Sequence, residues 1–381
     1  MALTGNKGEW TELYVLAKLL SDGKLFQSDI NLNKEEDNYY EVVKAYKDSL
    51  EFERKEIISL YIVSKEVKEL IGEFTPEYLL EKTAELKTGI LNGRGKSFEI
   101  KEVEDFILNA NIRSIKAKSG SKSDIKLRIY DHRLAKETDL GFSIKSLLGA
   151  DSTLLNTGPG NNFIFKVTPK KEFALAEFNK HTYKPSGGIS KLTHRLQILE
   201  KEYLSTISFK SIQSNQLWKN LKMVDGDLPE IIAHCLLYRW IDRTPKIFEL
   251  VNLLEERDPL DFYKGEESEQ KLYDYKLKKF LAECAMGMTS ETPWHGIYDA
   301  TGGVIICKED GDIVCFHIYD FNLFREYLIN NTIFEQPSTG EDEENPGNER
   351  TTLGTKKYYY GWLYQEDNEL FLKINLQIRF N

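Results

Sequence analysis

Two ionisable side chains, Asp124 and Lys145, stand beside neighbouring apolar stretches of the sequence. Asp124 precedes a stretch with alternating apolar residues, and Lys145 lies in the next, "GFSIKS" at 141–146. A carboxylate is a hard oxygen ligand for Mg²⁺, and a nearby lysine can hold a phosphate or orient a water molecule. Burying a lysine is costly unless an anion meets it. The pair predicts metal-assisted hydrolysis of phosphodiesters; a structural Asp–Lys ion pair is the alternative.

Two strands and one helix must position these groups. Ile125, Leu127 and Ile129 alternate with polar residues, which predicts a strand directly after Asp124. If this strand and 141–146 form a hairpin-like pair, Asp124 and Lys145 lie at one end of the sheet. A helix is predicted at 8–20, where an apolar stripe recurs at helical spacing. That stripe consists of Trp10, Leu13, Ala17 and Leu20, with Glu9 and Glu12 on its flank.

The remaining elements predict a mixed chain that is helical in its middle and β-rich at its end. Thr75 and Pro76 are suited to the N-cap and the first position of a helix at 75–91. Asp310 and Gly311 predict the turn of a hairpin over 302–320. Further strands are expected at 40–47, 57–64, 161–167 and within 356–380, and further helices at 100–110, 190–204, 213–223, 227–243, 246–256 and 266–286. The length suggests one elaborated domain or two.

Charge is segregated along the chain. The net charge of −10 alone argues against a nucleic acid partner. However, residues 113–145 hold nine Lys/Arg against four acids, and 166–201 hold eight against three. A phosphate responds to charge within about 10 Å. The basic segments around 141–146 are therefore consistent with a phosphate-bearing partner. The alternative is chance clustering of charge on a solvated face.

Several motifs are excluded. "NGRGKS" at 92–97 lacks the first glycine of a phosphate loop and follows a helix, so we expect no nucleotide cofactor. The four cysteines have no CxxC spacing, which favours reduced cytoplasmic thiols over a zinc site. The six histidines lack metal-binding spacing. No apolar run is long enough for a membrane span, so no membrane partner is expected.

Longer stretches resemble a known family. Asp124 with Ser143-Ile144-Lys145 resembles a variant of the PD-(D/E)XK nuclease motif, which alone is weakly specific. "NKGEWTELYVLAKLLSDGKLF" (6–26), "GFSIKSLLGADSTLLN" (141–156), "PWHGIYDATGGVIICKEDGDIVCFHIYD" (293–320) and "KINLQIRF" (373–380) are similar to type II restriction endonucleases of the HpaII family. These stretches run from one end of the chain to the other, so the resemblance covers most of it.

The resemblance implies a fold and an activity. The expected fold is an α/β (α+β) restriction-endonuclease-like core, a mixed sheet flanked by helices, with a helical insertion and a β-rich C-terminal part. The expected regions are a nuclease core at 1–190, a helical region at 191–290 and a β-rich region at 291–381. The expected activity is Mg²⁺-dependent cleavage of double-stranded DNA at a short palindrome, within a bacterial restriction-modification system. HpaII-like enzymes cut CCGG between the cytosines, and cytosine methylation blocks them.

The motif departs from the family pattern at its second acid, which here is Ser143. Because a hydroxyl is a poorer Mg²⁺ ligand than a carboxylate, the missing charge is expected from Glu12, with Glu9 in reserve. The alternative for both is a solvated acidic flank, which the helix dipole also favours. The carbonyl of Ile144 is expected to complete the metal shell. In this arrangement Asp124 and Glu12 hold Mg²⁺, Lys145 orients water, and Ser143 bonds a metal-bound water.

DNA contacts are expected from loops and basic segments, because Arg and Lys contact guanine and phosphate most often. The candidates are Lys116, Lys118, Lys122, Asn156, Asn161, Asn162, Lys191, His194, Arg195, Arg350, Lys356 and Lys357. Many of these residues are equally consistent with an ordinary structural role in loops. The acidic segment 341–349, which precedes Arg350, has no firm explanation.

A palindromic double-strand cut usually needs two active sites, so we expect a homodimer. Two rival functions remain open at the level of sequence. One is a DNA-binding protein on a decayed nuclease core, which Ser143 favours. The other is a nuclease with a repair target.

Overall fold

The computed structural model describes residues 3–64, 67–115, 123–149, 152–182, 188–298, 300–335, 351–352, 355–356 and 360–380. Backbone contacts divide the chain into two compact units. The first unit comprises Met1–Ser152 and Ile297–Tyr327, and the second comprises Thr153–Gly296 and Leu328–Asn381. The division into regions 1–190, 191–290 and 291–381 stays a prediction, because grouping by contact does not test whether those ranges fold as domains.

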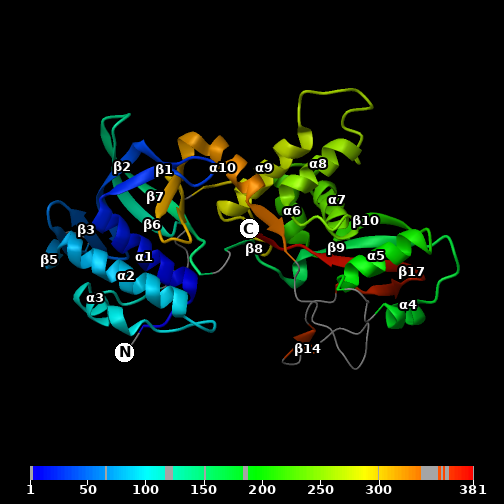
Figure 1. The fold of residues 1–381 in the computed structure, drawn as a ribbon, viewed down its shortest axis with the longest axis horizontal. Helices are drawn as coiled ribbons and strands as arrows, with labels where there is room; N and C mark the ends of the chain where they lie inside the picture. Colours follow the sequence, from blue (N-terminus) through cyan, green and yellow to red (C-terminus); the bar gives the residue numbers. More distant parts are fainter. Residues whose placement is uncertain are drawn as a thin grey trace. The chain divides into compact units, whose positions relative to one another are not determined.

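A nine-stranded sheet forms the centre of the first unit (Figure 1), in the order β1-β12-β11-β7-β6-β2-β3-β4-β5. The pairs β1–β12 and β11–β7 are parallel, and the other neighbours are antiparallel. β1 also pairs with β2, so six strands close a circuit of pairings. The strands are β1 (Lys24–Ser28), β2 (Lys34–Lys47), β3 (Leu50–Arg54), β4 (Ile58–Ser64), β5 (Val67–Phe74), β6 (Ile125–Asp131), β7 (Lys136–Ser146), β11 (Gly303–Cys307) and β12 (Ile313–His317). The mixed central sheet expected from the sequence is confirmed.

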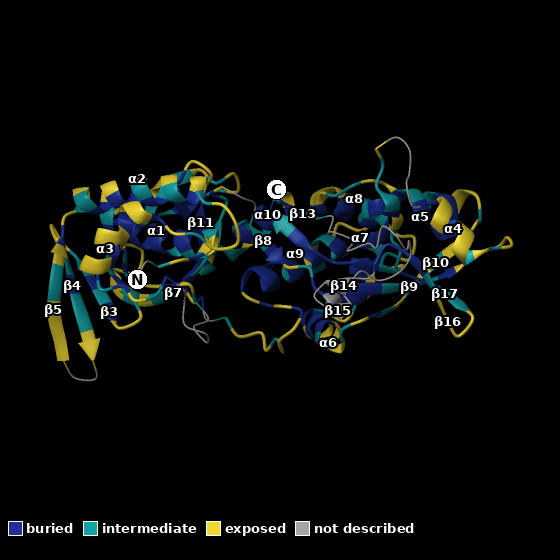
Figure 2. Ribbon diagram, turned by 90° about the horizontal axis from the view of Figure 1, so that it is seen from below, coloured by how far each residue is buried: buried dark blue, intermediate teal, exposed yellow. Residues whose placement is uncertain are grey.

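Helices α1 (Lys7–Asp22) and α2 (Pro76–Asn92) pack together on this unit's core. Asn6 and Glu9 form a capping box at the start of α1, and Gly23 ends it with a φ of 73°. The side chain of Thr75 accepts a hydrogen bond from the Tyr78 backbone N–H, which confirms the predicted N-cap of α2. The predicted α1 stripe is buried against the sheet, as the dark colour of α1 in Figure 2 shows.

The predicted hairpin is formed by β11 and β12 around Asp310 and Gly311, where Gly311 has a φ of 85°. Both strands are buried throughout. Phe316 packs against Phe324 and Tyr327 of α10 (Phe321–Asn330), which follows the short 3₁₀ turn Ile318–Asp320. These two strands are therefore covered on both faces within the first unit.

The second unit combines two small antiparallel sheets with a group of helices, of which α7 is largely buried (Figure 2). One sheet has the order β10-β9-β17-β16 and the other β13-β18-β8; β14 (Thr351–Thr352) pairs with β15 (Thr355–Lys356). The strands are β8 (Thr153–Leu155), β9 (Asn162–Thr168), β10 (Thr206–Ile212), β13 (Thr332–Phe334), β16 (Leu363–Glu366), β17 (Glu369–Asn375) and β18 (Ile378–Phe380). The helices are α4 (Leu175–His181), α5 (Lys191–Lys201), α6 (Asn215–Val224), α7 (Leu228–Ile241), α8 (Ile247–Arg257) and α9 (Leu272–Ala285), and Pro159–Asn161 forms a 3₁₀ turn.

Several elements differ from their predicted bounds, and β2 begins at Lys34 rather than at 40. β7 begins at Lys136 rather than at 141, because every residue of β6 has a register partner on it, ending with Asp131 opposite Lys136. The helix expected at 100–110 is a 3₁₀ turn (Lys101–Val103) followed by α3 (Glu104–Asn109). α9 begins at Leu272, six residues later than expected. Within the described ranges, no helix is long and apolar enough to cross a membrane.

Candidate active site

The start of β6 and the end of β7 bring Asp124 to the predicted motif. The two strands are antiparallel, with Ile125 opposite Phe142, and the Asp124 N–H continues the ladder by donating to the Phe142 carbonyl at 3.0 Å. The Asp124 carboxylate accepts hydrogen bonds from the Ile144 N–H at 2.6 Å and from the Ser143 Oγ at 3.1 Å. The two strands pair as predicted, and the Asp124 side chain contacts Ser143 and Ile144; that it acts together with Lys145 stays a prediction.

The alternation of β7 assigns its side chains to two faces. Ile144 packs against the hydrophobic core of the first unit, so Ser143 and Lys145 point to the opposite face. Lys145 is half-buried. In a strand, the N–H and C=O of one residue point to the same edge. Because the Ile144 N–H points to Asp124, its carbonyl lies on that edge too, which suits the metal-binding role expected for it.

Glu12 lies on α1 and is half-buried. Burial first, and then the negative charges of Asp124 and Glu9, raise its pKa to about 8, against the opposing effect of the positive charge of Lys47. Two carboxylates whose charges act on each other in a partly desolvated place favour a cation between them. Glu9 has a different role, because its carboxylate accepts a hydrogen bond from the Asn6 N–H at 2.8 Å.

Lys47 is a member of this charge cluster that the sequence did not single out. It ends β2, and its Nζ donates to the Ile115 carbonyl at 3.3 Å. Burial lowers the pKa of Lys47, while the charges of Glu12 and Asp48 raise it. The sequence predicted that the strand ends at Lys47. No sequence pattern, however, links Lys47 to Glu12, which is far away in the chain.

The oxygen donors fit Mg²⁺ in type, since both side-chain ligands are carboxylates and the third donor is a backbone carbonyl. Among the residues that the structure describes, no group of three or more His, Cys, Asp or Glu side chains is placed to hold a metal ion. Any metal here would therefore rely on the Asp124 and Glu12 carboxylates, on backbone oxygen and on water.

The predicted DNA contacts in the second unit are placed differently from one another. Asn156 is exposed, while Lys191 and His194 are half-buried in the first turn of α5. Asn161 and Asn162 are buried: Asn161 donates to the Asn156 and Leu376 carbonyls, and Asn162 donates to the Gln213 side chain. Their amides hold loops together in this conformation, and DNA contact by them stays a prediction.

Arg195 is fully buried on α5. Its guanidinium donates to the Thr182 hydroxyl at 3.1 Å and to the Gly361 carbonyl, and lies 3.6 Å from the centre of the Trp362 ring. DNA reading by Arg195 would require these contacts to open. Of the remaining candidates, Lys356 contributes its backbone to β15, and the others lie outside the described residues: Lys116, Lys118, Lys122, Arg350 and Lys357.

Comparison with known proteins identifies the family of the chain. A family model described as HpaII restriction endonuclease matches residues 6–380. The type II restriction enzyme HpaII of Haemophilus parainfluenzae is 33% identical over 388 aligned positions, covering 99% of this chain and 98% of that enzyme. No solved structure matches. These matches support a site-specific nuclease. The chain belongs to the HpaII restriction endonuclease family.

Proposed function

We propose that this restriction endonuclease hydrolyses double-stranded DNA at CCGG, cutting between the cytosines and leaving 5′-phosphates. The observation that carries the proposal is the Asp124 carboxylate, held by the Ser143 hydroxyl and the Ile144 N–H at the open end of β6. The arrangement supports a role for Asp124 as an anionic oxygen ligand, with Lys145 on the same strand as Ser143, in a core that we propose to be of the PD-(D/E)XK type. The target sequence and the cut position rest on the family, at 33% identity to a relative.

The proposed chemistry is in-line attack of water on the scissile phosphate. The oxygen of the water bonds to phosphorus and its proton passes to solvent, while the bond from phosphorus to the 3′ oxygen breaks and that oxygen takes a proton from solvent to become a 3′ hydroxyl. Lys145 orients the water and offsets the charge that develops on the phosphate. Asp124, Glu12 and the Ile144 carbonyl would hold Mg²⁺. When bound, Mg²⁺ supplies Lewis-acid stabilisation of the phosphate and of the leaving oxygen.

Ser143 hydrogen-bonds Asp124 and so fixes the orientation of that carboxylate. This gives the residue a use in a working site, which favours the nuclease over a decayed, purely DNA-binding protein. Two copies of the chain are required to cut both strands of a palindrome in one encounter, so we propose a homodimer on DNA, acting in the bacterial cytoplasm where the DNA lies.

The test is digestion of unmethylated plasmid by the purified protein with Mg²⁺, followed by sequencing of the fragment ends. We expect discrete fragments whose ends all derive from CCGG, and no cutting of the same plasmid after cytosine methylation of that site. Fragment ends that all derive from another palindrome would show that CCGG is not the recognition sequence. Retarded DNA without cutting would instead support the binding protein, and scattered ends would support a repair nuclease.

A further inference from the structure

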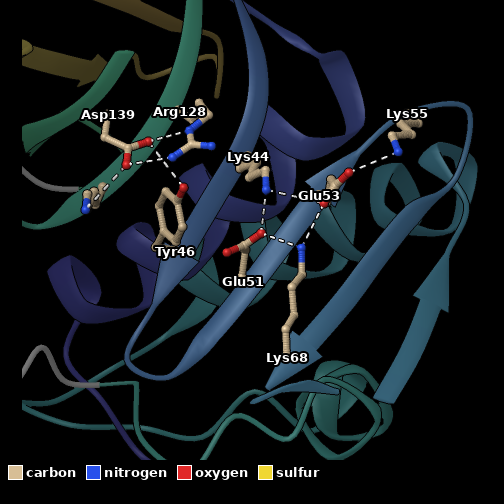
Figure 3. Close-up of polar contacts among 9 residues, drawn as sticks. Lys44, Tyr46, Glu51, Glu53, Lys55, Lys68, Arg128 and Asp139 are labelled. Carbon is tan, nitrogen blue, oxygen red and sulfur yellow. Dashed lines mark hydrogen bonds and ion pairs between the residues drawn. The ribbon is translucent and has the colours of Figure 1, made fainter. Parts of the chain in front are cut away.

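A layer of charged side chains covers one face of the first-unit sheet beside the candidate active site (Figure 3). Leu127 and Ile129 of β6 face the hydrophobic core that α1 covers. Their neighbours Lys126 and Arg128 therefore point to the opposite face. By the same alternation Ser143 and Lys145 lie on this face, so the charged layer shares one side of the sheet with these two residues.

Asp139 is the acid of this layer closest to the site, and its carboxylate is already occupied. Arg128 donates to both oxygens, from Nε at 2.7 Å and from Nη2 at 3.0 Å. The hydroxyl of Tyr46 adds a third hydrogen bond at 3.2 Å (Figure 3). A two-pronged Arg–carboxylate pair is the strong form of such an interaction, so Asp139 has little attraction left for another cation.

Lys126 is that other cation. Its Nζ lies 3.8 Å from Asp139 Oδ2, beyond hydrogen-bond distance, and its side chain is 54% exposed. The ammonium group lies 5.0 Å from the centre of the Tyr46 ring. The ring holds the lysine over the sheet by a cation–π contact, and Arg128 takes the carboxylate that would otherwise pair with it.

The lysines labelled in Figure 3 are bound more closely than Lys126. Lys44 and Lys68 share Glu51 and Glu53, with shortest distances of 2.7 Å and 2.8 Å to Glu51 Oε1. Lys55 lies 3.0 Å from Glu53. Each of these ammonium groups therefore has a glutamate oxygen within hydrogen-bond distance. The nearest acid oxygen to Lys126 Nζ among the described residues, by contrast, is farther away, at 3.8 Å.

The position of Lys126 matches a phosphate near the reacting one. Lys126 follows Asp124 by two residues, about 6.6 Å along a strand. Each DNA strand presents one phosphate per roughly 3.4 Å of helix axis, so a lysine at this offset can reach a phosphate that neighbours the one at Asp124. We propose that Lys126 binds a backbone phosphate flanking the scissile one, positioned by Tyr46 and by the Arg128–Asp139 pair. The proposal rests on the proposed function, because it takes double-stranded DNA as the ligand at Asp124.

The experiment measures binding of a short CCGG duplex in Ca²⁺ without Mg²⁺ over a range of salt concentrations. It compares the wild-type chain with Lys126→Met, Lys126→Arg and Lys68→Met. Lys68 is the matched control, because its amine also lies over a tyrosine ring, 3.9 Å from the centre of Tyr61, yet is held by two glutamates. Unfolding of each variant in urea shows that the fold is kept.

Loss of one phosphate contact reduces the slope of log affinity against log salt by about 0.9. At 0.1 M salt this corresponds to roughly eightfold weaker binding, and it should be the same for a duplex without CCGG, because a phosphate contact carries no base information. We expect this loss for Lys126→Met, near-wild-type binding for Lys126→Arg, and the wild-type slope for Lys68→Met. Equal slopes for Lys126→Met and wild type overturn the proposal, as do equal losses for Lys126→Met and Lys68→Met.

Cleavage of CCGG plasmid by the wild-type chain is measured in parallel. Binding without cleavage would overturn the proposed nuclease function, and the slopes would still decide the role of Lys126. A wild-type chain that neither binds nor cuts would overturn both.

Discussion

Replacing Glu12 by glutamine should make the metal-free protein more stable at high pH. The folded-state pKa of Glu12 is about 8, against 4.5 for an ordinary glutamate. The folded chain therefore keeps a proton that the unfolded chain has released, and the free energy of unfolding falls as the pH rises from about 4.5 to about 8. A shift of this size makes the loss about 4 kcal/mol between pH 5 and pH 9. Glutamine stays neutral and removes that loss.

The assay is urea unfolding of wild type and Glu12→Gln at pH 5 and pH 9 with chelator present. All other titrating groups are shared, so the difference between the two proteins isolates Glu12. Glu9→Gln is the matched control on the same helix; it should keep most of the wild-type pH dependence, because Glu9 makes the smallest of the contributions to the raised pKa of Glu12. If wild type and Glu12→Gln lose the same free energy between the two pH values, the electrostatic account of this site is wrong.

Two further predictions concern the reacting groups and the second unit. Asp124→Ala and Lys145→Ala should each lower the plasmid cleavage rate roughly 100-fold or more while duplex binding and urea unfolding stay near wild type; normal cutting by Asp124→Ala would show that the metal site lies elsewhere. Asn220→Ala should lower the free energy of unfolding by about 3 kcal/mol, because the buried Asn220 amide donates to the Thr289 and Thr292 carbonyls and accepts from the Trp294 N–H. A loss below about 1 kcal/mol in urea unfolding would count against that role.

Local patterns predicted the parts of the fold that neighbouring residues determine. The α1 stripe, the Thr75 cap and the Asp310-Gly311 turn each depend on a few residues close in sequence, and each was found where it was predicted. The antiparallel pairing of the strand after Asp124 with 141–146 was also predicted, because a short connection between two strands favours such a pair; the hydrogen bond from Ser143 to Asp124 was not.

Long-range packing set the features that the sequence did not reveal. Arg195 lies between Leu192 and Leu196 on the buried side of α5, and its partners Gly361 and Trp362 are more than 160 residues away. A basic helix start is typical of a DNA contact, so the pattern alone favoured exposure. Lys47 was missed for the same reason, since its neighbour Glu12 belongs to a helix that reaches it only through the tertiary fold.

Ser143 and Glu12 can be understood together. A carboxylate at position 143 would lie beside Asp124, whose oxygen the serine hydroxyl now approaches to 3.1 Å. With Glu12 already sensing the charge of Asp124, a third acid would add repulsion that only a bound cation could offset. With Ser143 on the strand and Glu12 on the helix, Asp124 and Glu12 are the two acids available to a metal. The Ser143 hydroxyl then orients the Asp124 carboxylate. We therefore expect Glu12 of α1 to supply the acid missing from the strand, and its protonation to control metal binding.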